Sequence, residues 1–149
     1  MKTFAMLIIC VLQLFGNGMI KDRDFIDLIN SVDHVEVYQD GKRICYFDDL
    51  ALLSELKILF SNSREMPAFG VSLHNETVKA MKVGLWIELC FDNKYLHNGM
   101  EFEKLLINVE NSSTGINLIR YNSGKYEGRC FYIDLIDVDT SKLYKQLIS

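Results

Sequence analysis

The chain has 149 residues, of which 49% are hydrophobic and 11% aromatic, and its formal net charge is -4. This composition is typical of a folded globular protein and far from that of a disordered chain. The acidic balance, without any cluster of Lys or Arg, argues against nucleic acid as a partner and against an anionic membrane surface.

The first residues have the pattern of a secretory signal peptide. Lys2 precedes an apolar run from Phe4 to Phe15, and the small residues of Gly16-Asn17-Gly18 follow it. The run is shorter than the roughly 20 residues that span a bilayer. We expect cleavage before Met19, contact with the membrane only in transit, and a mature protein that is secreted or held in the cell envelope. A buried N-terminal helix and an uncleaved, membrane-tethering helix are the alternatives.

Residues 19–149 are predicted to form a single α+β domain, because they contain no linker, low-complexity tract or internal repeat. The first predicted helix spans residues 20–32, and its apolar positions are Phe25, Leu28, Ile29 and Val32.

A β-hairpin is predicted next, over the stretch HVEVYQDGKRICYF, because Asp40-Gly41 is a strong signal for a two-residue turn. This turn would place Val37 opposite Ile44, and Val35 opposite Tyr46, on one face. The other face would then carry Glu36, Tyr38, Arg43, Cys45 and Phe47.

The second predicted helix spans residues 49–60, with an apolar stripe of Leu52, Leu56, Leu59 and Phe60. From Pro67 onward the apolar residues alternate, which indicates strands. Leu85, Ile87, Leu89 and Phe91 form one face of a long strand. Further strands are predicted after the turns at Asn98-Gly99 and Asn122-Ser123-Gly124, and Thr140 is expected to cap a short closing helix.

The predicted fold is therefore α+β: an N-terminal helix and β-hairpin, a helix, an antiparallel meander of four to five strands, and a short C-terminal helix. Antiparallel pairing is expected because the turns are too short for parallel crossovers. A curved sheet wrapped on a helix suits this order of elements.

Cleavage before Met19 would leave three cysteines, Cys45, Cys90 and Cys130, so at least one thiol would have no partner within the chain. A Cys90–Cys130 disulfide is possible if their strands are neighbours, since facing residues on paired strands approach closely. Three unpaired thiols acting as small hydrophobic side chains are the alternative. The hairpin places Glu36, and no thiol, opposite Cys45.

No motif for a metal, a cofactor or a catalytic site emerges. The sequence has no CxxC or HExxH motif, and its histidines, His34, His74 and His97, are isolated. The acidic stretch around Asp134 lacks the glycine and the terminal Glu of an EF-hand. Two sequons, at Asn75 and Asn111, would matter in a eukaryotic secretory pathway.

One face of the predicted sheet is the candidate binding surface. Trp86, Glu88, Tyr132 and Asp134 share it by alternation, and Tyr38 joins them from the hairpin. Trp and Tyr supply large contact areas with a polar group, which suits a ligand or a partner. The same face would alternatively pack beneath the helix at residues 49–60.

These observations favour a small exported module without enzymatic activity that binds a protein or small-molecule ligand through one sheet face. The alternative is a small exported hydrolase or transferase that uses a Cys, a His or an Asp. A His or Asp within hydrogen-bond reach of a cysteine, in a cleft, would favour the enzyme.

Overall fold

The computed structural model describes residues 25–48, 50–61, 63–70, 83–109, 115–135 and 140–148. The predicted signal peptide and both sequons lie outside these residues. The helices in the described ranges are Phe25–Asn30 (α2), Leu50–Ser61 (α3) and Thr140–Ile148 (α5). The strands are His34–Gln39 (β1), Lys42–Phe47 (β2), Ser63–Gly70 (β3), Leu85–His97 (β4), Met100–Asn108 (β5), Gly115–Asn122 (β6), Lys125–Tyr126 (β7) and Arg129–Leu135 (β8).

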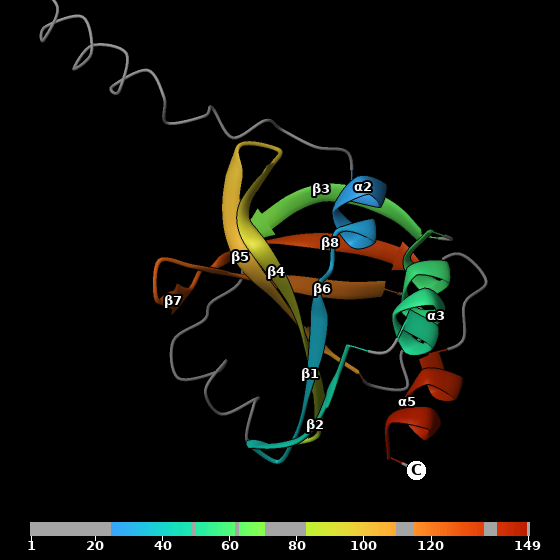
Figure 1. Ribbon diagram of the computed structural model, residues 1–149. Helices are drawn as coiled ribbons and strands as arrows, with labels where there is room; N and C mark the ends of the chain where they lie inside the picture. Colours follow the sequence, from blue (N-terminus) through green and yellow to red (C-terminus); the bar gives the residue numbers. More distant parts are fainter. Residues whose placement is uncertain are drawn as a thin grey trace, which may run out of the picture.

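The strands in these ranges form one antiparallel sheet in the order β2-β1-β4-β5-β6-β8-β3, and β7 pairs with β6. Strands β3, β6 and β8 run across the direction of β1 and β4, so the sheet is strongly coiled (Figure 1). The antiparallel character and the broadly α+β composition are confirmed, and the sheet makes up more of the fold than the sequence predicted.

Three tight turns have the backbone conformation that their sequences require. Asp40-Gly41, Asn98-Gly99 and Ser123-Gly124 each place two successive residues at positive φ, between 48° and 86°. That conformation defines the type I′ turn, whose twist matches the twist of the flanking strands. The predicted turns are therefore confirmed, and they fix which strands become neighbours.

The main core lies between the helices and one face of the sheet. Leu28 of α2, Leu56 of α3 and Leu143 of α5 pack with the alternating residues of β4. The sequence predicted an apolar stripe on each of two helices. Every stripe side chain within the described residues is buried: Leu28, Ile29, Val32, Leu56 and Phe60. The side chains of Phe25, Leu52 and Leu59 lie outside the described residues.

The register of the predicted hairpin is wrong by one residue over most of β2. Val37 pairs with Cys45 and Val35 with Phe47, because a bulge follows the regular pair of Tyr38 and Arg43. A bulge inserts one extra residue into one strand. Each residue beyond it therefore points to the face opposite to the one that a regular register would give it. Cys45 therefore packs toward the main core instead of opposing Glu36.

Strand β3 was missed by the sequence analysis. It pairs with β8 at the far edge of the sheet, and its register shifts between Met66 and Phe69, the stretch that contains Pro67. Proline lacks an N–H donor and is confined to edge strands and bulges, so Pro67 marks an edge strand here.

Truncating a core side chain should destabilise the protein far more than truncating a surface side chain. Leu89 is 1% exposed, so Leu89→Ala should lower the free energy of unfolding by roughly 2–5 kcal/mol. Ile58, on α3, is 61% exposed, and Ile58→Ala should change it by no more than about 0.5 kcal/mol. Urea unfolding of both variants tests this, and equal losses would contradict the assignment of the core.

Candidate functional site

The candidate site lies on the face of the sheet that points away from the main core. On this face β1 and β4 pair residue by residue, with Glu36 opposite Glu88, Tyr38 opposite Trp86 and His34 opposite Cys90. On the next strand Lys104 pairs with Cys90. We call this side of β1, β2, β4, β5 and β6 the second face.

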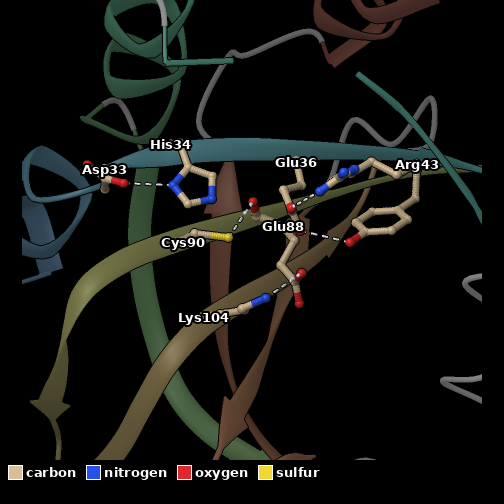
Figure 2. A network of polar contacts seen from close by, with 8 residues as sticks. Asp33, His34, Glu36, Arg43, Glu88, Cys90 and Lys104 are labelled. Carbon is tan, nitrogen blue, oxygen red and sulfur yellow. Dashed lines mark hydrogen bonds and ion pairs between the residues drawn. The ribbon is translucent and has the colours of Figure 1, made fainter. Parts of the chain in front are cut away.

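Two carboxylates form the centre of the site. The side chain of Glu88 is 3% exposed and that of Glu36 is 12% exposed. Carboxylate oxygens of both residues and the sulfur of Cys90 lie within 4.8 Å of one another. Figure 2 shows both carboxylates between Arg43 on one side and Lys104 on the other.

Four donors satisfy the four carboxylate oxygens. Glu36 accepts hydrogen bonds from Arg43 Nη1 at 2.6 Å and from the Tyr38 hydroxyl at 2.8 Å. Glu88 accepts one from the Tyr126 hydroxyl at 2.7 Å and one from Lys104 Nζ at 3.3 Å. Two cations thus balance two anions, and the network needs no further counterion.

The environment favours the ionised forms of Glu36 and Lys104 and the neutral forms of the two tyrosines. Burial alone would raise the pKa of Glu36, but the hydrogen bonds from Tyr38 and Arg43 outweigh it and lower that pKa. Burial would lower the pKa of Lys104, yet the negative charge of Glu88 raises it. Burial and the bond to a glutamate raise the pKa of each tyrosine, Tyr38 and Tyr126, which therefore stay neutral donors.

Cys90 lies beside this network as a protonated thiol. Burial raises its pKa to about 12, and its sulfur donates a weak hydrogen bond to the Glu88 carbonyl oxygen at 3.8 Å. His34, across the strand pair, has its Nδ1 2.7 Å from an oxygen of Asp33. The order Asp-His-Cys resembles a nucleophile with its base, but nucleophilic attack needs a thiolate, which this environment disfavours.

Glu36, Glu88 and Cys90 are also a set of groups that could ligate a divalent metal. All four carboxylate oxygens already accept a hydrogen bond, and two of the donors are cations. A metal ion would have to displace these donors and would add positive charge beside them. The described geometry therefore favours a closed ion-pair network over a metal centre.

The structure brings together three of the five residues predicted for the binding face. Tyr38, Trp86 and Glu88 are neighbours on β1 and β4. Tyr132 and Asp134 lie on β8, and β5 and β6 separate them from β4. There Asp134 forms an exposed ion pair with Arg64 of β3, at 3.7 Å.

The strand adjacency assumed for a Cys90–Cys130 disulfide does not exist. Cys90 is on β4 and Cys130 on β8, with two strands between them. Cys45, Cys90 and Cys130 form no disulfide with one another. Burial raises the pKa of each thiol, in agreement with the alternative that they act as small hydrophobic side chains.

The second face is not the face beneath helix α3, which packs on the main core. It carries a separate small cluster of Trp86, Leu106 and Ile119, with Tyr38 and Tyr126 packed against it. Trp86 donates from its ring nitrogen to the carbonyl of Val83. The second face is therefore closed over β4 and β5, whereas it is open over β2, where Tyr46 is 50% exposed.

Sequence reasoning missed Lys104 and Tyr126 as members of the site and did not connect Arg43 with it. Lys104 reaches Glu88 from β5, and Tyr126 comes from the two-residue strand β7. The order of the strands was needed to find them. One signal was available in the sequence. Glu88 is a charged residue in a largely apolar stretch of strand, and a buried carboxylate requires a cation or hydrogen-bond donors on a neighbouring strand.

A second, partly buried polar pair lies at the other end of β4. His97, an isolated histidine in the sequence, is only 4% exposed. Its Nε2 lies 2.8 Å from both oxygens of Glu65 on β3, and its ring contacts Phe131 edge to face. Because β3 and β4 are not paired in the sheet, this contact joins two distant strands across the core.

Comparison with models of protein families, with curated proteins and with solved structures finds no match to this chain. Across the described ranges, none of the helices combines the length and the apolar character that crossing a membrane requires.

Glu88→Gln should destabilise the protein, because it removes the buried negative charge that Lys104 faces. We expect a loss of about 1–3 kcal/mol in the free energy of unfolding, measured with urea. Glu103→Gln on the neighbouring strand β5 is the matched control, since Glu103 forms a partly exposed ion pair with Lys94 at 3.7 Å and should matter far less. Equal effects would mean that the network contributes nothing.

The lowered pKa of Glu36 predicts a loss of stability in acid. A carboxyl group whose pKa is lower in the folded state contributes stability above its unfolded pKa, near 4.5, and loses it as the pH falls through the folded pKa. The stability difference between wild type and Glu36→Gln should therefore shrink as the pH drops below about 4.5. A difference that stays constant from neutral to acidic pH would contradict the ion pair.

Proposed function

We propose that this chain is a small exported binding module without enzymatic activity, and that it contacts its partner through the open part of the second face over β2. The observation that carries the proposal is Arg43. Its guanidinium is bound to the buried carboxylate of Glu36 at 2.6 Å, while 58% of its side chain is exposed. A restrained, exposed arginine is suited to recognition because little of its conformational freedom is lost on binding.

Two large side chains with apolar surface are exposed on the same strand as this arginine. Ile44 is 45% exposed and Tyr46 is 50% exposed on the same strand. We call Arg43, Ile44 and Tyr46 the β2 patch. Tyrosine and arginine are, with tryptophan, the residues most enriched among the energetically dominant contacts of interfaces. The ring of Tyr46 lies 4.7 Å from that of His34, which restricts its motion.

The chemistry of the site supports binding more than catalysis. Cys90 is buried and its pKa is about 12, so it is a poor nucleophile at neutral pH. Its hydrogen bond goes to the Glu88 carbonyl, and His34 is bonded to Asp33. The export part of the proposal rests on the sequence pattern of residues 1–18.

The test is capture of a partner from the extracellular or envelope fraction of the host. Immobilised wild type should retain a partner, and Tyr46→Ala should bind that partner at least about tenfold more weakly, the effect of losing one dominant contact. Ile58→Ala is the control, because it also truncates an exposed apolar residue, but on α3. Equal retention by Tyr46→Ala would exclude the β2 patch.

A further inference from the structure

Strand β2 lies at an edge of the sheet and pairs only with β1 among the described strands. We propose that the open edge of β2 pairs with β2 of a second copy of this chain, antiparallel and about a two-fold axis between Ile44 and Cys45. The proposal uses the same patch as the proposed function and names one partner for it. Addition of a strand to an open edge is a common mode of recognition.

The sequence of β2 is complementary to itself in this orientation. Its first half carries the cations Lys42 and Arg43, and its second half carries the aromatic residues Tyr46 and Phe47. A two-fold axis between Ile44 and Cys45 places Arg43 opposite Tyr46 of the second copy, and the reverse. Closed two-fold interfaces have this reciprocal form.

The faces of the sheet agree with this pairing. Arg43 pairs with Tyr38, and Tyr46 pairs with Glu36, so both lie on the second face. A two-fold axis perpendicular to the sheet keeps that face on the same side in both copies. Each guanidinium would then meet the exposed ring of a tyrosine, which is a favourable cation–π arrangement, while Glu36 holds it in place.

The charges select the antiparallel orientation. Parallel pairing in register would set Lys42 and Arg43 beside their own copies, and like charges directly opposite are destabilising. Cations on an edge strand ordinarily oppose association. Here the two-fold arrangement moves the cations to opposite ends, so the pattern excludes one orientation and permits the other.

Sedimentation of the full chain over a range of concentrations tests the proposal. Wild type should show a monomer–dimer equilibrium. Tyr46→Arg should weaken dimerisation at least about tenfold, because it brings two arginines together. The double variant Arg43→Tyr/Tyr46→Arg should restore it, since the exchange recreates the same pair and leaves an arginine opposite Glu36. Ile58→Arg on α3 is the control for added charge and should dimerise like wild type.

A wild-type chain that stays monomeric would overturn the proposal, as would self-association that Tyr46→Arg leaves unchanged. Failure of the double variant to recover would overturn the proposed register, provided that its circular dichroism spectrum matches that of wild type. A monomeric wild type that still captures a different protein through Tyr46 would refute only this inference and leave the proposed binding function standing.

Discussion

The structure depends on how two like charges, Glu36 and Glu88, are accommodated where they face each other on neighbouring strands. Like charges directly opposite destabilise a sheet, and burial adds a desolvation cost. Tyr38 of β1, Arg43 of β2, Lys104 of β5 and Tyr126 of β7 offset both costs. Five strands must therefore keep their relative positions, and this requirement fixes the geometry of the second face from β2 to β7.

Much of the fold follows from local sequence. The type I′ turns need two residues at positive φ, and Asp-Gly, Asn-Gly and Ser-Gly provide them. Alternation then places Leu85, Ile87 and Leu89 in the core, as predicted. The edge strand β3 escaped detection because Pro67 argues locally against a strand, whereas its pairing with β8 is a long-range interaction that no local pattern reveals.

The candidate site could be predicted only in part, for the same reason. Alternation within one strand placed Trp86 and Glu88 on a common face, and the hairpin turn added Tyr38. Their relation to Tyr132 and Asp134 depended on which strands are neighbours, and β5 and β6 intervene. The partners of the carboxylates are likewise cross-strand contacts. Periodicity assigns a residue to a face, and strand order decides which residues on that face meet.

The exposed surface of β2 depends on a single extra residue. With the regular register, Tyr46 would pair with Val35 and Ile44 with Val37, and both would point toward the main core. The bulge, whose extra residue is Ile44, moves Cys45 and Phe47 into those positions, where they pack against the core. Tyr46 then pairs with Glu36 on the second face. A bulge changes the face to which side chains point and interrupts the regular hydrogen bonding between the strands. Here it places an aromatic ring on the same face as the arginine that Glu36 restrains. Arg43 pairs with Tyr38 on the regular side of the bulge, so the bulge is what brings the exposed ring of Tyr46 to the face that already carries the restrained cation. This is why we place the binding surface on β2.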